Sequence, residues 1–158
     1  MHNTLREKQK KDDFAREMCY TVEVKNKILE LITMKIINTK DAPAAVGPYS
    51  QACDMGDYVF CSGAIPLDPV SGEIVGTTIE EQSHRVFKNL KAVLGEAGLD
   101  FSNVVKTTVF LDDMGNFAAL NGVYNEYFVA PYPARSCVEV GKLPKGVMVE
   151  CECIAKRG

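Results

Sequence analysis

Two stretches of the chain place apolar residues three and four positions apart, a spacing typical of amphipathic helices. The first stretch opens with Thr78-Ile79-Glu80-Glu81, which fits a helix-capping box, and Gly98 marks its end. Its apolar stripe consists of Ile79, Val86, Phe87, Leu90, Val93, Leu94 and Ala97. The second stripe consists of Phe117, Leu120, Tyr124 and Phe128. We therefore predict two helices, one over residues 78–98 and one over residues 117–128.

Runs rich in β-branched residues, or with alternating apolar positions, predict the strands. They cover residues 34–38, 50–55, 58–62, 104–111, 134–140 and 147–155. Gly56-Asp57 between the second and third runs is a hairpin turn signal. Residues 104–140 then form a strand–helix–strand crossover, which is right-handed in nearly all proteins. The order of elements predicts an α+β fold, a mixed sheet with both helices on one face.

Helices on one side of a sheet leave its other face bare. Burying that face against copies of the same chain removes the exposed apolar surface. We therefore expect a homo-oligomer.

The distribution of glycine and proline divides the chain into two unlike parts. All 12 glycines and 7 prolines follow Met34, and residues 1–33 are rich in charge instead. We expect a charged extension over residues 1–33, helical or disordered, and one domain over residues 34–158. Our favoured interpretation is that the extension is an upstream segment and that Met34 is the natural start. The alternative is a docking helix for a partner, built on the apolar positions of residues 20–32.

Charge and hydropathy exclude several classes of protein. The chain has 18 Lys and Arg against 21 Asp and Glu, a net charge of -3, so it has no chain-wide basic field for nucleic acid. No apolar run approaches the roughly 20 residues that cross a bilayer, and no signal-peptide core follows the basic start. The acidic residues among the first 33 argue against a transit peptide. We expect a cytoplasmic protein without nucleic-acid or membrane partners.

The six cysteines predict neither a metal site nor disulfides. They occur at positions 19, 53, 61, 137, 151 and 153, without a Cys-x-x-Cys pair and with only two histidines in the chain. We expect reduced thiols that are mostly small core residues, with Cys151 and Cys153 on the same face of a strand. No glycine-rich phosphate loop precedes a helix, so no nucleotide cofactor is expected.

Arg135 and Glu150 are the candidate functional pair. Arg135 begins an apolar strand, and Glu150 lies in the final strand on a face with two apolar side chains and a second acid. We expect both at the bare face, where an arginine fork binds a carboxylate and a glutamate orients or deprotonates a water. A structural ion pair at an interface is the alternative that spacing leaves open. Neither His2, in the extension, nor His84, on the polar side of a helix, is placed to activate a nucleophile.

Four motifs resemble those of the RidA (YjgF) family of enamine and imine deaminases. They are Gly47-Pro48-Tyr49-Ser50-Gln51-Ala52, Val59-Phe60-Cys61-Ser62-Gly63-Ala64-Ile65-Pro66, Pro133-Ala134-Arg135-Ser136-Cys137-Val138-Glu139-Val140, and Leu143-Pro144 followed by Val149-Glu150-Cys151-Glu152. They appear in family order, and the resemblance spans residues 34–158.

The resemblance implies a chorismate-mutase-like fold, a homotrimer with active sites between subunits, and a reaction without cofactor or metal. The implied reaction is hydrolysis of 2-iminobutanoate and 2-iminopropanoate to 2-oxo acids and ammonia. Arg135 is expected to clamp the substrate carboxylate, and Glu150 to hold and activate the water. Backbone groups of Gly63 and Cys137 are expected to contact the substrate. The side chains of Tyr49, Ser62 and Asn121 are expected to line the pocket.

Two other functions stay open at this point. Relatives are described as endoribonucleases or translation inhibitors, although the acidic charge balance speaks against tight RNA binding. A non-catalytic protein that binds 2-oxo acids in the same cleft is the second alternative. The presence of both Arg135 and Glu150 favours catalysis.

Overall fold

The computed structural model describes residues 16, 18–25 and 34–158. The chain divides into two units, Met1–Thr33 and Met34–Gly158. In the first unit, residues 16 and 18–25 are helical. The rest of the predicted charged tail and docking segment lies outside the described residues.

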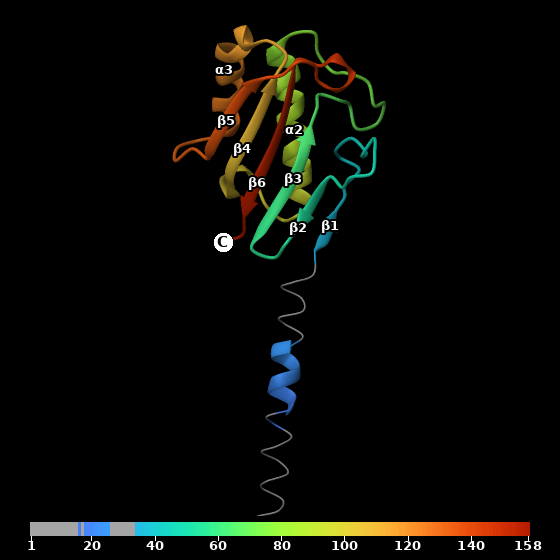
Figure 1. Cartoon of the computed structure of the whole chain (residues 1–158), viewed down its shortest axis with the longest axis vertical. Coiled ribbons are helices and arrows are strands. Elements are labelled where there is room, and N and C mark those ends of the chain that lie inside the picture. The colour runs from blue at the N-terminus through green and yellow to red at the C-terminus, as the bar shows by residue number, and fades with distance from the viewer. Residues whose placement is uncertain (1–15, 17, 26–33) are drawn as a thin grey trace, which may run out of the picture. The chain divides into compact units, whose positions relative to one another are not determined.

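The second unit is built on a six-stranded mixed sheet (Figure 1). Its strands are β1 (Lys35–Ile37), β2 (Ala52–Asp54), β3 (Tyr58–Ala64), β4 (Val104–Leu111), β5 (Ala134–Glu139) and β6 (Val149–Lys156). They lie in the order β1-β2-β3-β6-β4-β5, and every neighbouring pair is antiparallel except β4 and β5, which run parallel. The second long helix lies between β4 and β5 in the sequence, as the predicted strand–helix–strand crossover requires.

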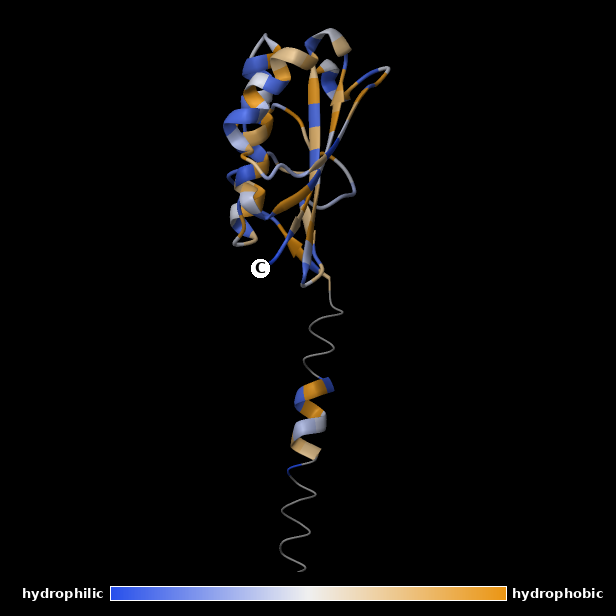
Figure 2. Cartoon of the chain, turned by 90° about the vertical axis from the view of Figure 1, so that its left-hand side faces the viewer, coloured by the Kyte–Doolittle hydropathy of each residue, from blue (hydrophilic) through white to orange (hydrophobic). Residues whose placement is uncertain are grey.

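Two helices cover one face of the sheet (Figure 2). Helix α2 (Ile79–Glu96) starts at the predicted capping box, because Thr78 accepts a hydrogen bond from the Glu81 amide and the Glu81 carboxylate accepts one in return. Helix α3 (Phe117–Tyr127) ends one residue before the predicted boundary. The α+β prediction with both helices on one face is therefore confirmed. Short 3₁₀ turns occupy Phe101–Asn103, Met114–Asn116 and Pro144–Gly146.

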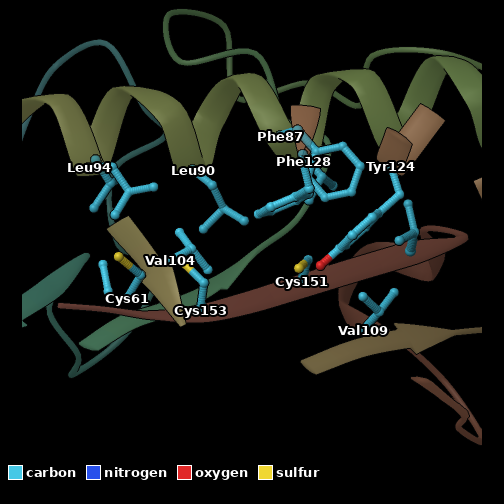
Figure 3. Packing of buried hydrophobic residues seen from close by; sticks show 14 of the residues in the cluster. Cys61, Phe87, Leu90, Leu94, Val104, Val109, Tyr124, Phe128, Cys151 and Cys153 are labelled. Atoms are coloured by element: carbon cyan, nitrogen blue, oxygen red, sulfur yellow. The ribbon is translucent and has the colours of Figure 1, made fainter. Parts of the chain in front are cut away.

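The core lies between these helices and the sheet (Figure 3). Phe87 and Leu90 of α2 and Phe128 after α3 are almost completely buried, and each such side chain contributes about 1.5–3 kcal/mol through burial. Cys61, Cys151 and Cys153 pack beneath them as free thiols. The shared face predicted for the last two is confirmed, but only these three of the six cysteines are fully buried.

Within residues 34–158, no helix covers the opposite face of the sheet, here called the open face (Figure 2). Strand alternation and register place on it Phe60, Lys106, Thr108, Phe110, Val138, Glu150, Glu152 and Ile154. Phe60 and Val138 are 46% and 43% exposed, so apolar and charged groups are mixed on this surface. Within the described part of the chain, no helix is long and apolar enough to cross a membrane.

Candidate active site

A β-bulge in β3 shapes the open face at one end. Cys61 pairs with Cys153 and Ala64 with Cys151, so three steps along β3 match two along β6. The extra residue falls at Ser62-Gly63. The Ser62 hydroxyl donates a hydrogen bond to the Ser50 carbonyl at 2.7 Å, and its amide donates to the Gln51 carbonyl at 3.0 Å. Bulges of this kind re-aim backbone groups and are frequent beside active sites.

The Glu150 side chain lies directly over Gly63. A Cβ atom added to Gly63 would collide with the Glu150 carboxylate, so glycine at this position lets the Glu150 side chain lie against the backbone of the bulge. Glu150 is half-buried in β6. Burial, and then the neighbouring charge of Glu152, raise the pKa of Glu150. A carboxyl group with a raised pKa is a stronger base, when it is deprotonated, than an ordinary glutamate.

A cleft of about 430 Å³ opens beside this glutamate. Its lining consists of Val46, Tyr49, Ser62, Gly63, Ile65, Pro144, Lys145 and Glu150. It therefore brings together four residues that the sequence predicted for one site. Tyr49 is 50% exposed, and its hydroxyl accepts a hydrogen bond from the Val46 amide at 3.3 Å.

Buried side-chain amides hold the loops around the cleft. Gln51 donates to the carbonyls of Thr39, Ala42 and Pro43, which fixes the segment leading to Val46. In α2, Asn89 donates to the carbonyls of Ile65 and Leu67 at 3.0 and 2.9 Å. These residues are 7% and 1% exposed, and such fully paired buried networks rigidify the backbone that they bind.

Gln82 of α2 joins two further segments near Glu150. Its amide nitrogen donates to the Gly76 carbonyl at 3.1 Å, and its amide oxygen accepts from the Met148 amide at 2.8 Å. Met148 is two residues before Glu150. Helix α2, on the covered face of the sheet, therefore supports the backbone beside Glu150, although the cleft opens on the other face.

Arg135 lies away from this cleft, on the helix-covered side of edge strand β5. It pairs with Thr107, whose side chain points to α3, whereas Glu150 pairs with Phe110 on the open face. The expectation that Arg135 and Glu150 share one face is therefore wrong within a single chain. Thr107 and Phe110 are three residues apart in β4, so their side chains point to opposite faces of the sheet. Arg135 and Glu150, their respective strand partners, therefore also lie on opposite faces.

The Arg135 guanidinium stacks on aromatic rings of α3. Its central carbon lies 4.7 Å from the ring centre of Tyr124 and 5.5 Å from that of Phe117. The Tyr124 hydroxyl lies 2.9 Å from the Thr107 hydroxyl. Among residues 16, 18–25 and 34–158, no carboxylate lies within ion-pair distance of Arg135. The cation is thus held by ring faces rather than by an acid.

Comparison with known proteins decides the family. Residues 39–157, inside the second unit, match the family model described as endoribonuclease L-PSP. The chain belongs to this family. It is the RidA (YjgF) family that the four motifs resemble, so that prediction is confirmed.

The alignments with individual relatives cover nearly the whole length of each relative. A mouse protein named 2-iminobutanoate/2-iminopropanoate deaminase is 46% identical over 127 residues, which is 80% of this chain and 94% of the relative. A RutC family protein of Sinorhizobium fredii is 52% identical over 118 residues, 75% of this chain and 94% of the relative. The solved structure of E. coli TdcF with bound serine is 46% identical with a TM-score of 0.75, covering 78% of this chain and 99% of TdcF.

The remaining predicted RidA site residues lie near Arg135 rather than in the cleft. Cys137 is half-buried on β5, two residues after Arg135 and on the same side. Burial raises the pKa of the Cys137 thiol, against the opposing charge of Arg135, which disfavours a thiolate nucleophile. Asn121 lies on α3 at helical spacing from both Phe117 and Tyr124, half-buried. We name this group, with Arg135, the arginine edge.

His84 is less solvated than its position on the polar side of α2 predicts. Its Nδ1 lies 3.0 Å from the Tyr127 hydroxyl, and its Nε2 lies 3.8 Å from the Glu126 carboxylate. These contacts join α2 to α3, so His84 is a link between helices. No group of three or more His, Cys, Asp or Glu residues suited to a metal occurs in the described ranges.

Sequence reasoning missed half of the cleft lining, namely Val46, Ile65, Pro144 and Lys145. Lys145 adopts a left-handed conformation with φ of 58°, and its ammonium donates to the Gly72 carbonyl at 3.0 Å. A lysine between proline and glycine just before a strand signals a tight turn, but not that the turn borders a cleft.

Proposed function

We propose that this RidA-family protein hydrolyses small 2-imino acids, such as 2-iminobutanoate and 2-iminopropanoate, to 2-oxo acids and ammonia. A mouse relative carries the name of this activity, and E. coli TdcF has been solved with a small amino acid bound. The observation that carries the proposal is the half-buried Glu150, with its raised pKa, over the glycine of the bulge. Imine hydrolysis needs a group of this kind to handle the protons of one water.

The proposed site requires a second copy of the chain. Lys145 lines the cleft but donates to the Gly72 carbonyl, and among the described residues no cation lies within ion-pair distance of Glu150 and no carboxylate within that distance of Arg135. The two groups lie on opposite sides of one sheet. A neighbouring copy that covers the open face can bring its arginine edge to the cleft and bury Phe60 and Val138. We propose a homotrimer with cyclic symmetry, in which each cleft is completed by the next subunit.

The proposed chemistry balances without any additional reactant. The substrate is the protonated imine, and Glu150 accepts a proton from water as the water oxygen attacks the C=N carbon, which gives a neutral carbinolamine. Glu150 returns this proton to the amine nitrogen, the C–N bond breaks, and the hydroxyl passes its own proton to Glu150 as it becomes the carbonyl of the 2-oxo acid. Transfer of that proton to the released ammonia restores the carboxylate, so one residue serves as base and as acid.

Arg135 is proposed to orient the substrate through its carboxylate. The guanidinium fork matches a carboxylate with two parallel hydrogen bonds, and fixing this end directs the imine carbon toward the water. Backbone amides at Gly63 and Cys137 are proposed as further donors. The proposed partners are thus the imino acid and copies of the chain itself.

The test couples the purified protein to a threonine dehydratase in the presence of semicarbazide. The dehydratase releases 2-iminobutanoate, and semicarbazide traps the part that is not hydrolysed. We expect the protein to slow the initial formation of semicarbazone, and the E150Q variant not to slow it. No effect of the wild-type protein would reject the deaminase proposal, and cleavage of RNA that requires Glu150 would favour the endoribonuclease alternative instead.

A further inference from the structure

The proposed function does not explain how Arg135, which pairs with no carboxylate among the described residues, stays oriented at the edge of the sheet. We propose that Tyr124 and Phe117 are positioning residues that hold the Arg135 guanidinium as a preformed receptor for a small carboxylate. The Thr107 hydroxyl fixes Tyr124 in this role. The proposal rests on the proposed function for the identity of the carboxylate, but the positioning itself is a property of this chain.

Thr107, Tyr124 and Arg135 contact one another in a ring, and Phe117 contacts Arg135 in addition. Thr107 is the strand neighbour of Arg135, and its hydroxyl lies 2.9 Å from that of Tyr124. The Tyr124 ring reaches from α3 down to the sheet (Figure 3), where its centre lies 4.7 Å from the guanidinium carbon. Phe117, two helical turns earlier, presents its ring to the same group at 5.5 Å.

Two of the supporting groups, Thr107 and Tyr124, are more deeply buried than the arginine that they support. Thr107 and Tyr124 are 0% and 4% exposed, and the Tyr124 ring also stacks on Phe128 with ring centres 4.2 Å apart. Burial is the main reason that the pKa of Tyr124 is raised, so its hydroxyl stays neutral and keeps the hydrogen bond with Thr107. A ring that is fixed on several sides gives the flexible arginine a defined orientation.

Ring contacts leave the useful edges of the guanidinium available. A cation–π contact uses the flat face of the group, whereas its N–H donors lie in the plane and point outward. No described carboxylate pairs with Arg135, so these donors remain for a ligand. Because stacking already restricts the side chain, less freedom is lost when a carboxylate binds.

The experiment compares binding of 2-oxobutanoate with binding of the neutral 2-oxobutanamide, by calorimetry on the full chain. The variants are Y124L, which removes the ring, Y124F, which keeps it, and F117L at a less buried position. Y127L is the matched control, because Tyr127 is an aromatic residue of the same helix that packs on Phe87 and Phe101 and not on Arg135. Relaxation of the Arg135 Nε–Hε group by NMR, assigned with R135K, reports its order without any ligand.

We expect Y124L to weaken 2-oxobutanoate binding about five- to thirtyfold while leaving the amide within twofold. F117L and Y124F should lose about threefold each, and the Nε–Hε group should become more mobile in Y124L. Wild-type affinity and wild-type Arg135 order in folded Y124L and F117L would overturn the proposal. An equal loss in Y127L would also overturn it, since that loss would reflect helix packing in general.

Failure of the proposed function gives a different result. If the wild-type protein hydrolyses no imine and binds no 2-oxobutanoate, the deaminase proposal is rejected. The Arg135 mobility in Y124L then decides the positioning proposal by itself. If imines are hydrolysed and Y124L changes neither affinity nor Arg135 order, the positioning proposal alone is wrong.

Discussion

The cleft and the arginine edge each hold one half-buried charged group, but they hold it by different means. At the cleft, the Glu150 carboxylate sits against the backbone of the bulge, where burial raises its pKa. At the edge, the Arg135 guanidinium lies against two aromatic rings. The carboxylate is poised to change its protonation state, and the guanidinium is fixed with its charge intact. The difference suggests two tasks, proton transfer and anion binding, divided between two surfaces.

The largest expected effect comes from removing the proposed proton-transfer group, Glu150. E150Q keeps the shape of the side chain but cannot accept a proton, so we expect kcat to fall about 10²- to 10⁴-fold with little change in KM. The semicarbazide assay at saturating substrate measures this.

The neighbouring acid provides the matched control for E150Q. Glu152 helps to raise the pKa of Glu150, so E152Q should keep activity and move the acid limb of the pH–rate profile to lower pH. In the wild-type protein that limb should lie above the ordinary glutamate pKa, because Glu150 must be deprotonated to act as a base. A limb that does not move in E152Q would count against Glu150 as the titrating group.

The second largest effect should follow from filling the space under Glu150. In G63A the new methyl group displaces the carboxylate, and we expect kcat/KM to fall about 100-fold, the scale of a misplacement near 1 Å. G95A is the control, because a Cβ on this helical glycine meets nothing within 4 Å and favours the helix. Equal kcat/KM for G63A and wild type would contradict the claim that activity depends on the position of the Glu150 carboxylate over Gly63.

Most of the fold was predictable because its elements carry strong local signals. Strand β4 has the predicted bounds, and α2 begins at its capping box. The side of the sheet on which Arg135 lies was not predictable. Along β5, neither Ala134-Ser136-Val138 nor Arg135-Cys137-Glu139 is clearly apolar. An edge strand that buries no residue fully on either side leaves no hydrophobic pattern from which to assign a face.

Other parts of the candidate site depend on contacts between distant segments. The four family motifs named Tyr49, Ser62, Gly63 and Glu150, which the structure brings to one cleft. The bulge at Gly63 appears only when the register of β3 against β6 is known. The contacts of Arg135 with Tyr124 likewise need the packing of α3 on β5, which no local spacing encodes.

A satisfied ion pair elsewhere in the second unit sharpens the comparison. Asp54 of β2 accepts a hydrogen bond from Arg157 at 2.6 Å and caps the Gly56 amide at 2.9 Å. Burial alone would raise the pKa of Asp54, but Arg157 and Gly56 together lower it. Because this pair joins the chain end to the sheet, we expect D54A to destabilise the protein by about 1–3 kcal/mol, with activity unchanged at low temperature.

Urea unfolding of D54A against wild type measures this loss. Since the folded-state pKa of Asp54 is lowered, its contribution is present at neutral pH and is lost as the pH falls through that value. The difference between D54A and wild type should therefore shrink in acid. A difference that is the same at all pH values would contradict the assigned ion pair.

The smallest expected effect is a gain in stability when Glu150 is neutralised. A carboxyl group with a raised folded-state pKa binds its proton more tightly in the folded than in the unfolded protein, so it lowers stability as the pH rises above its unfolded pKa. E150Q should therefore melt at a slightly higher temperature than wild type at neutral pH. In scanning calorimetry this advantage should vanish in acid, and a lower Tm at neutral pH would contradict it.

The most direct test of the proposed shared site mixes two variants that are each expected to be inactive. E150Q lacks the functional group of the cleft, and R135A lacks that of the arginine edge. When equal amounts are mixed, mildly denatured and refolded, the intact cleft of an R135A subunit can meet the intact arginine edge of an E150Q subunit. In a cyclic trimer with random mixing, about one quarter of the sites regain both groups, so about one quarter of the wild-type activity should return. No recovery in mixed trimers verified by native mass spectrometry would contradict the claim that the site is built from two copies of the chain.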